Sequence, residues 1–475
     1  MSAIRRLAAG AGGALAAAML VPQAALAHGL VGKSDLPIPR WLFAWAAAVV
    51  LVVSFVALAT LWSRPRLEAI EERPVWRLPR FLDPLCGAIG LALFVVVIYA
   101  GFAGQPEATA NVLPTWIYVT FWVGLAFASM LVGDVFRAFN PWRAFARGVA
   151  WAAARVRGDR GLPEAMDYPE WLGRWPAVVG ILGFAWLELI YANKDVPQIL
   201  AELSLGYAAV QLVGMSLYGI ETWSTRAEAF SVYFGLFARL APLHWTKQQL
   251  SRRPPFVGAV TLEVMPGTIA LLAAMIGSTS FDGFSVGSDW VGTNGLFSKL
   301  QSLFSDLGVS ITTASELAGT VGLICMVCLI GGFFRLGIAG MRSLGGDHTA
   351  GDLAQRFIHT LIPISLAYVV AHYFSLLVYQ GQAMAYLISD PLGNGSNLLG
   401  TASVSIDYNV ISANVIWYVQ VGALITGHVA GLALAHERAL VTYRRLRMAT
   451  QSQYWMLAVM VGFTSLGLWI LSSTY

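Results

Sequence analysis

Apolar residues occur along the chain in long runs that are separated by shorter polar segments. A helix rises about 1.5 Å per residue, so about 20 apolar residues cross the ~30 Å hydrocarbon core of a bilayer. Stretches of suitable length recur ten times after residue 40, at 41–62, 84–104, 115–134, 176–192, 198–219, 257–277, 317–338, 357–380, 410–430 and 453–472. The pattern predicts an all-α fold, a polytopic membrane bundle of about ten transmembrane helices.

The first 27 residues have the pattern of a secretory signal peptide rather than of a membrane span. Arg5-Arg6 gives a basic start, an apolar stretch follows over residues 7–21, and Ala25-Leu26-Ala27 has the small residues of a cleavage site. Cleavage leaves His28 at the start of a single transmembrane domain, residues 28–475. An uncleaved anchor is the alternative, which the break at Val21-Pro22 disfavours.

Composition narrows the class of protein. Charged residues make up 12% of the 475 positions and hydrophobic residues 57%, and the mean hydropathy is +0.65. A soluble globular domain carries about 25% charged residues. The composition therefore excludes a soluble enzyme, a disordered chain and a nucleic-acid-binding protein. Cys86, Cys325 and Cys328 lie in or beside apolar runs, and no disulfide framework can be built from them.

The basic residues test the topology independently. With residue 28 outside, the segments after the odd-numbered spans face the cytoplasm and hold 24 of the 30 Lys and Arg residues, whereas the opposite segments hold four. Because cationic loops cross a membrane with difficulty, this bias fixes the orientation. We expect a bacterial inner-membrane protein with both mature termini in the periplasm. The longest predicted loops are periplasmic 278–316 and 383–409 and cytoplasmic 135–175 and 220–256.

Ionisable and amide side chains within the spans are the candidates for function, because such groups are costly in a bilayer and normally face a bundle interior. Those in the outer half or near the middle are Glu188, His372, Asn414 and Gln420. Glu188 and His372 lie about 7 and 12 Å below the outer edge at ~1.5 Å per residue. We expect them to meet at a cavity open to the periplasm. The alternative is a structural Glu–His pair that locks two helices.

Three segments carry a resemblance to a known group of proteins. They are the mature start His28–Pro39, which is followed at once by a Trp-rich span, and the segments Val232–Leu240 and Phe281–Ser285. The chain resembles bacterial multi-spanning membrane proteins labelled fenitrothion hydrolase, and the resemblance runs over most of its length. It implies hydrolysis of an organophosphate triester with release of a nitrophenol. It brings no established catalytic motif, so no site residue is transferred.

The chemistry of triester hydrolysis suggests roles for the outer set. A site needs a base or a metal to activate water, and a donor or positive group for the phosphoryl oxygen. Glu188 with His372 offers a base and its orienting partner, and Tyr373, Asn414 and Gln420 offer donors. The leading hypothesis is a membrane-embedded hydrolase of organophosphate triesters or similar apolar esters.

A second set of polar groups lies in the inner half of the predicted spans. Its possible metal ligands, of types that suit zinc or iron, are His359, His428, Asp134 and Glu263. For His428 an interhelical hydrogen bond is the main alternative. Gly427 and Gly431 flank it in a G-x-x-x-G pattern, which lets a neighbouring helix approach closely.

Cys325-x-x-Cys328 places two thiols on one face of the seventh predicted span. Thiolates select Cu(I), and an N-terminal His28 offers an amine and an imidazole for Cu(II). Together they support a different class of function, a transporter or metal-handling permease. Packing as small apolar residues is the alternative for the cysteines, and for His28 the alternative is merely the residue that follows the cleavage site.

The remaining polar positions have simpler interpretations. We expect Asp282 and Asp289 to be solvated turn residues of the outer loop, and His436 to be solvated at the cytoplasmic surface. The expected partners are the lipid bilayer and a small apolar substrate. A third hypothesis makes the chain a non-catalytic subunit that works with a companion membrane protein.

Overall fold

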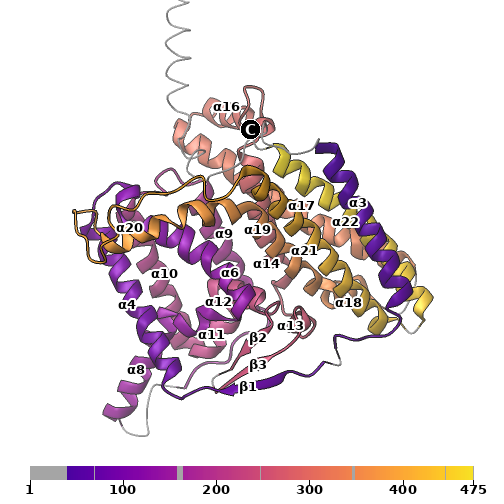
Figure 1. Cartoon of the computed structure of the whole chain (residues 1–475), viewed down its shortest axis with the longest axis horizontal. Coiled ribbons are helices and arrows are strands. Elements are labelled where there is room, and N and C mark those ends of the chain that lie inside the picture. The colour runs from indigo at the N-terminus through magenta and orange to yellow at the C-terminus, as the bar shows by residue number, and fades with distance from the viewer. Residues whose placement is uncertain are drawn as a thin grey trace, which may run out of the picture.

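The computed structural model describes residues 40–68, 70–157, 164–246, 248–344, 348–443 and 445–473. The predicted signal peptide and His28 lie outside these residues. The described chain is almost entirely helical and has one small sheet, as Figure 1 shows. The predicted fold class, an all-α polytopic bundle, is confirmed.

The helices before residue 240 form the first part of the chain. Their bounds are α3 (Arg40–Leu61), α4 (Leu82–Ala103), η2 (Ala108–Ala110), α5 (Val112–Thr115), η3 (Trp116–Gly124), α6 (Leu125–Val132), α7 (Val135–Phe139), α8 (Pro141–Arg157), α9 (Trp175–Leu189), α10 (Pro197–Tyr218), α11 (Ile220–Arg226) and α12 (Ala229–Ala238). Helix η3 is a π-helix that joins α5 to α6 in one continuous rod.

The second part of the chain contains the longest helices. Its bounds are α13 (Val257–Val260), α14 (Thr268–Ser285), α15 (Ser288–Val291), α16 (Leu296–Asp306), α17 (Ile311–Ser343), α18 (Ala350–Phe357), η5 (Ile358–Thr360), α19 (Leu361–Gln380), α20 (Ala383–Ser389), α21 (Ala413–Thr442) and α22 (Leu446–Ser473). The predicted loop 383–409 therefore begins with one short helix.

Seven helical segments among the described residues are long and apolar enough to cross a membrane. They are Leu82–Ala103, Val112–Val132, Pro197–Tyr218, Ile311–Ser343, Ala350–Gln380, Ala413–Thr442 and Leu446–Ile470. Each coincides with one predicted span. The predicted spans 41–62 and 176–192 match the shorter apolar helices Trp45–Leu61 and Trp175–Leu189.

The predicted span 257–277 is wrong. Helix α13 ends at Val260, the chain is not helical over 261–267, and α14 then continues to Ser285. Gly267 permits this break because its φ of +84° is left-handed, which glycine adopts without strain. The predicted outer loop 278–316 consequently starts inside α14, where polar side chains are buried in the bundle rather than solvated.

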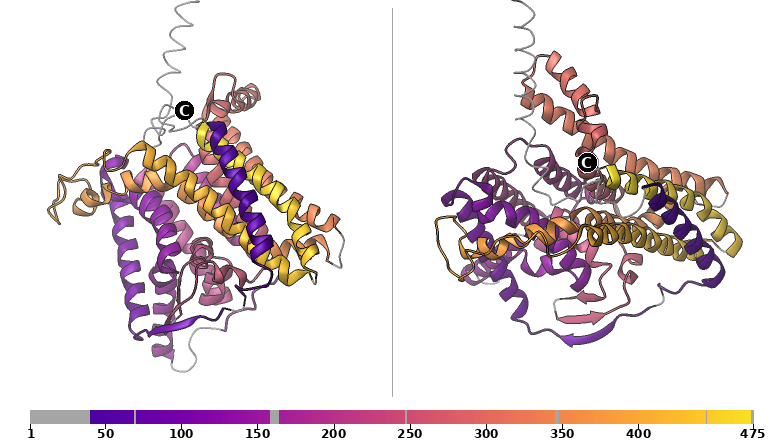
Figure 2. Two further views of the ribbon diagram at one scale, coloured as in Figure 1. Left: turned by 45° about the vertical axis from the view of Figure 1, so that its right-hand side comes forward. Right: turned by 45° about the horizontal axis from the view of Figure 1, so that its top comes forward.

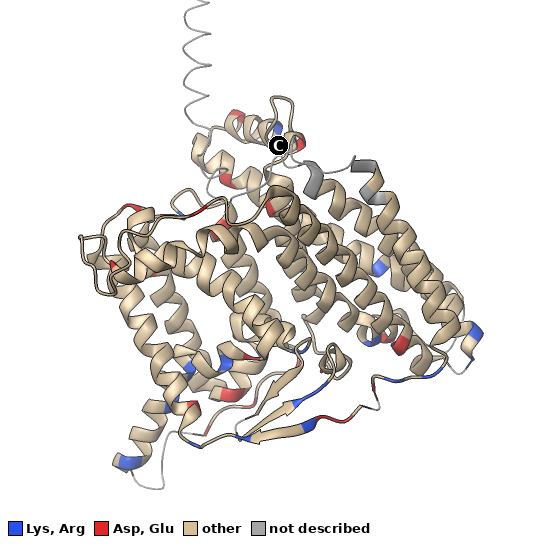
Figure 3. Cartoon of the chain, viewed as in Figure 1, with Lys and Arg blue, Asp and Glu red and all other residues tan. Residues whose placement is uncertain are grey.

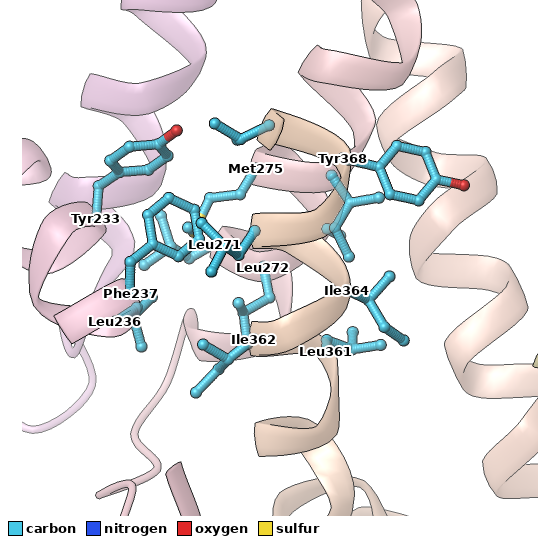
Figure 4. Packing of buried hydrophobic residues seen from close by; sticks show 14 of the residues in the cluster. Tyr233, Leu236, Phe237, Leu271, Leu272, Met275, Leu361, Ile362, Ile364 and Tyr368 are labelled. Atoms are coloured by element: carbon cyan, nitrogen blue, oxygen red, sulfur yellow. The ribbon is translucent and has the colours of Figure 1, made fainter. Parts of the chain in front are cut away.

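The predicted cytoplasmic loop 220–256 also contains buried structure. Eight of the ten residues of α12 are buried. Glu228 caps this helix by accepting from the backbone N–H groups of Phe230 and Ser231, at 3.0 and 2.7 Å. Figure 4 shows the core that results, with Tyr233, Leu236 and Phe237 of α12 beside Leu271, Leu272 and Met275 of α14 and Leu361, Ile362, Ile364 and Tyr368 of α19. At ten residues α12 is too short to span a bilayer, so hydropathy alone does not reveal it.

Two groups of helices meet at this core. Figures 1 and 2 show α4 and α6 to α12 together, and α3 beside the C-terminal helices α21 and α22. Helix α14 contacts α9 on one side and α17 and α19 on the other, so it joins the two groups. Helix α21 packs closely on α19. A Cβ at Gly427 would lie 2.2 Å from the Ala367 Cβ, which confirms the predicted close approach at the G-x-x-x-G pattern.

One end of the bundle carries the sheet, formed by β1 (Arg73–Arg77), β2 (Leu243–Trp245) and β3 (Gln249–Arg252) in the antiparallel order β1-β3-β2. Lys and Arg residues gather around this sheet in Figure 3, and we call it the basic end.

The predicted loop 135–175 lies at the basic end and contains α7 and α8. Arg143 of α8 is buried and pairs with Asp83 and Glu221 at 3.2 and 2.8 Å. These ion pairs hold α4, α8 and α11 together at the basic end.

Candidate functional site

A chain of buried polar side chains connects α9, α14 and α19, and we call it the acidic cluster. It consists of Glu188 on α9, Asp282 on α14, and His372 and Tyr373 on α19. Their exposed fractions are 7, 6, 9 and 2%, so water has little access to any of them. Such groups are costly to bury, and they persist in an apolar bundle when they bond to one another.

Asp282 is the centre of the acidic cluster. Its Oδ2 atom lies 2.8 Å from Nε2 of His372 and accepts a hydrogen bond of 2.8 Å from the Tyr373 hydroxyl. Two consecutive residues of α19 therefore reach one carboxylate of α14. The prediction that Asp282 is a solvated turn residue is wrong, because α14 extends past it and turns its side chain into the interior.

Tyr373 connects the two carboxylates. Its hydroxyl interacts with the carboxyl group of Glu188 as well as with that of Asp282. Glu188 and His372 are thus linked only indirectly, through Tyr373 and Asp282, and their direct meeting at a cavity stays a prediction. The predicted opening to the periplasm remains a prediction, since all four side chains are buried.

Two aromatic side chains, Trp122 and Tyr233, lie next to the acidic cluster. The rings of Trp122 and Tyr233 stack with centroids 4.4 Å apart, and Trp122 also lies 4.7 Å from Phe184. Both rings are buried, and among the described residues the Tyr233 hydroxyl has no hydrogen-bond partner. Trp122 lies next to the Tyr373 hydroxyl. Trp122 lies in the π-helix η3. π-Helices are rare in proteins, and those that occur are often found at functional sites.

A cavity of about 760 Å³ adjoins these rings, between α4, η3, α9, α10 and α12. Its lining is almost wholly apolar and rich in aromatic groups, among them Phe94, Phe121, Phe184 and Phe230. We call it the aromatic cavity. Its volume and lining are those of a site for a small apolar molecule.

The other two predicted members of the outer set lie elsewhere. Gln420 is buried on α21, and Asn414 is exposed in the first turn of the same helix. Within the described ranges, neither is hydrogen-bonded to Glu188, His372 or Tyr373. A single site containing Glu188, His372, Asn414 and Gln420 depends on how each helix is rotated about its axis. The pattern of apolar residues does not give that rotation.

The predicted metal set is not assembled. No group of three or more His, Cys, Asp or Glu side chains among the described residues is arranged to hold a metal ion. Asp134 lies among arginines and caps α7 by accepting from the Arg137 N–H, and Glu263 is 68% exposed and pairs with Arg226. Positive neighbours of this kind repel a metal cation.

The two histidines of the predicted metal set are buried, each with an Nε2 atom that has no partner in the described structure. The Nδ1 atom of His428 lies 2.7 Å from the Leu424 carbonyl of its own helix. The prediction of an interhelical hydrogen bond for His428 is therefore wrong. The glycines beside it bring the helices together by backbone contact instead.

The predicted copper ligands are not brought together either. Cys325 and Cys328 are free thiols on the exposed surface of α17, so they do not pack inside the bundle, and His28 lies outside the described residues. In a membrane, that surface of α17 faces lipid.

His436 is fully buried rather than solvated. Its Nδ1 lies 3.1 Å from Oε1 of Gln453, and its Nε2 lies 2.8 Å from the Trp62 carbonyl. The imidazole therefore links α21 to α22 and to the end of α3. The prediction failed because the residues after α3 fold back over this helix end.

Asp282 is the residue that sequence reasoning missed, and two signals surround it. Polar residues Ser278-Thr279-Ser280 occupy the turn before it, all buried on α14. The pattern Gly283-Phe284-Ser285-Val286-Gly287 after it matches G-x-S-x-G, which in α/β-hydrolases forms a strand-to-helix turn. Here Ser285 ends a helix and donates to the backbone carbonyl of Asp282 at 2.8 Å, so the pattern is not a nucleophile elbow.

Comparison with known proteins identifies no relative of the chain. No protein family, no curated protein and no solved structure matches the chain. The resemblance to fenitrothion hydrolases stays a prediction.

Proposed function

We propose that this protein is a proton-coupled membrane carrier for a small apolar molecule. The observation that carries the proposal is the acidic cluster, in which Asp282 bonds to the imidazole of His372 and the phenol of Tyr373, and Tyr373 interacts with the second carboxyl, that of Glu188. The aromatic cavity lies near this cluster. Chains of Asp, Glu and His inside a membrane are typical of proton relays in pumps and transporters.

The charge balance of the acidic cluster supports proton exchange. Glu188 and Asp282 are two carboxyls in one apolar interior, and like charges so placed are not both ionised without large cost. A proton shared among them moves from Glu188 to Tyr373 and then through Asp282 to His372. Phe184 lines the aromatic cavity and contacts Trp122, and Trp122 in turn lies near Tyr373. An occupant of the cavity therefore reaches the acidic cluster through Phe184 and Trp122.

Hydrolysis of an organophosphate triester is the second candidate, and the Asp282–His372 hydrogen bond favours it. A carboxylate that orients an imidazole is the usual arrangement of a general base. The burial of all four groups favours the carrier over the hydrolase, since hydrolysis needs water and the phosphorus atom at the imidazole. A non-catalytic subunit has no observation that favours it.

One probe separates the two candidates. Fenitrothion is added to the purified chain in sealed proteoliposomes and in detergent. The carrier predicts movement of protons, recorded by a pH-sensitive dye inside the vesicles, with intact triester and no turnover in detergent. The hydrolase predicts nitrophenol release in detergent without any gradient.

Variants test the acidic cluster itself. Asp282→Asn keeps the shape of the side chain but removes its charge, and we expect it to abolish the proton signal. For the hydrolase, His372→Ala lowers turnover about 10²- to 10⁴-fold, the usual contribution of a general base. Asp289→Asn on α15 is the matched control, because Asp289 is exposed. Equal signals from Asp282→Asn and Asp289→Asn contradict both candidates.

The proposed location is the bacterial inner membrane, with both mature termini in the periplasm. The segregation of 24 Lys and Arg residues to one set of segments supports the basic end as the cytoplasmic end.

A further inference from the structure

The basic end contains a second cavity, which the proposed carrier function does not use. Its volume is about 380 Å³, and we call it the arginine cavity. Its lining contains four positively charged residues, Arg137, Arg174, Arg239 and Arg253, and two acidic residues, Glu72 and Asp134. Leaving His244 aside, the four arginines exceed the two carboxyl groups by two formal positive charges.

Two of the four arginines are already neutralised. Arg137 pairs with Glu221 at 3.2 Å, and Arg253 pairs with Glu72 at 3.0 Å. Because their charges are already paired, the side chains of Arg137 and Arg253 line the cavity without adding free positive charge. With these two ion pairs set aside, the charged groups left in the lining are Arg174, Arg239 and the carboxyl of Asp134.

Arg174 and Arg239 contact only neutral groups in the part of the chain that the structure describes. Nη1 of Arg174 donates to Oγ1 of Thr268 at 3.2 Å, and Nη1 of Arg239 donates to the Gly258 carbonyl at 3.0 Å. Arg174 is 4% exposed, and its Nε has no hydrogen-bond partner. Burial lowers the pKa of Arg174 to about 10, and the positive charge of Arg239 acts in the same direction. Arg174 is buried and Arg239 is half-buried, and the two guanidinium groups repel each other, whereas the carboxyl groups of Glu263 and Asp134 offset part of their charge. A bound anion stabilises such a pair.

The local sequence fixes the position of Arg174. Its backbone N–H donates to the Pro266 carbonyl at 2.7 Å. Gly173 has a φ of +44°, and a Cβ there would lie 2.3 Å from the same carbonyl oxygen. The turn before α9 and the turn before α14 therefore interlock, and they hold the guanidinium at the wall of the arginine cavity.

Asp134 opposes an anion less than its formal charge suggests. Its Oδ1 accepts from the Arg137 N–H at 3.1 Å. Burial raises the pKa of Asp134, which favours the neutral form of the carboxyl group. The rim is partly exposed, since the side chains of Glu72 and His244 are 34 and 42% exposed. An anion can therefore enter at the basic end.

We infer that the arginine cavity binds a dianionic phosphate monoester group through Arg174 and Arg239. Planar guanidinium forks match the oxygens of a phosphate, and the positive charges of Arg174 and Arg239 attract its two negative charges. The phosphate belongs either to a soluble phosphate or to a lipid headgroup of the phosphatidic acid kind. Both sources present the same dianionic phosphate monoester group to the two arginines.

Inorganic phosphate is the probe for the soluble source. Calorimetry on the full chain in detergent at pH 7.5 measures its affinity, with chloride at equal ionic strength as the reference. We expect Arg174→Gln and Arg239→Gln each to weaken phosphate binding at least tenfold. Arg174→Lys, which keeps the charge, retains part of the affinity. Arg77→Gln is the matched control, because Arg77 is exposed on β1 outside the cavity and we expect unchanged binding.

Nanodiscs distinguish the two sources. Binding of free phosphate in phosphatidylcholine discs assigns a soluble ligand, whereas thermal stabilisation found only in phosphatidic acid discs, and lost in Arg239→Gln, assigns a lipid headgroup. The inference is overturned if neither probe binds, or if the Gln variants at positions 174 and 239 bind as tightly as the Arg77 variant. Size-exclusion profiles identify any variant that fails to fold, and the remaining variants then decide.

Discussion

At the scale of single residues, Glu437 shows how one buried carboxylate fastens a distant segment. Its Oε1 accepts from the backbone N–H groups of Arg66 and Leu67 at 2.6 and 2.5 Å, and its Oε2 accepts from Nε1 of Trp62 at 2.9 Å. Hydrogen bonds to a charged acceptor are stronger than those between neutral groups. This one side chain of α21 therefore fixes the end of α3 to the bundle.

We expect Glu437→Gln to destabilise the protein by about 1 to 3 kcal/mol, since an amide turns a donor toward one of the N–H groups and leaves it without an acceptor. Thermal unfolding measures the loss, and faster protease cutting between α3 and β1 locates it. Glu71→Gln is the control, because Glu71 is exposed in the same segment. An unchanged unfolding midpoint for Glu437→Gln would show that Glu437 does not fasten α3.

At the scale of elements, the contact of α19 with α21 depends on glycine for space. A Cβ at Gly427 would lie 2.2 Å from the Ala367 Cβ and 2.8 Å from the Pro363 carbonyl oxygen. We expect Gly427→Ala to force the helices apart and to cost about 1 to 3 kcal/mol, the usual range for overpacking. Thermal unfolding in detergent checks this value.

Gly422 provides a control on the same helix, because a Cβ there meets nothing within 4 Å. Gly422→Ala is expected to be neutral or stabilising by up to about 1 kcal/mol, since alanine favours a helix more than glycine does. Equal losses at the two positions would mean that helix propensity, rather than close packing, governs this interface.

The small sheet is expected to weaken in acid. Glu72 bonds to Nδ1 of His244 at 2.6 Å and to Nη1 of Arg253 at 3.0 Å. Burial alone would raise the pKa of Glu72, but hydrogen bonds and charges from His244 and Arg253 outweigh burial and lower it below 4.5. A lowered folded-state pKa means that this stabilisation is complete above the unfolded value and is lost as the pH falls through the folded one.

The difference in unfolding midpoint between the wild-type protein and Glu72→Gln measures this dependence. We expect the difference to shrink as the pH falls from about 5 through the lowered pKa of Glu72, because the protonated side chain resembles Gln. Glu71→Gln should show no such trend. A difference that persists at pH 3 would mean that the charge of Glu72 does not support the sheet.

At the scale of the whole molecule, hydropathy predicts features that depend only on the local amino-acid composition, such as the position of a membrane span. The apolar lengths of most spans are readable from the sequence, and so is the glycine contact at Gly427. Helices α12 and α14 are not, because α12 is too short to count as a span and α14 carries Asp282 among buried serines. Their placement depends on which helices surround them.

The acidic cluster shows the same division. Glu188 and His372 are identifiable one by one, since each is a costly group within an apolar run. Asp282 joins the cluster because of how α14 is rotated against α19 and how deep it lies beside it. Neither the rotation nor the depth can be read from the amino-acid sequence of α14 alone. The predicted metal set fails for the converse reason, because Asp134 and Glu263 form local bonds with arginines in place of a shared ion.

The orientation of the bundle is the last prediction. Single cysteines replace Leu399, an exposed residue of the loop after α20, and Val75, an exposed residue of β1, after Cys86, Cys325 and Cys328 are changed to Ser. Figure 1 shows α20 and β1 at opposite ends of the described bundle. Because the basic end is expected to stay inside, a membrane-impermeant maleimide should label Leu399→Cys in intact spheroplasts and Val75→Cys only after lysis. The reverse labelling would place the arginine cavity in the periplasm, where a cytoplasmic phosphate ester could not reach it.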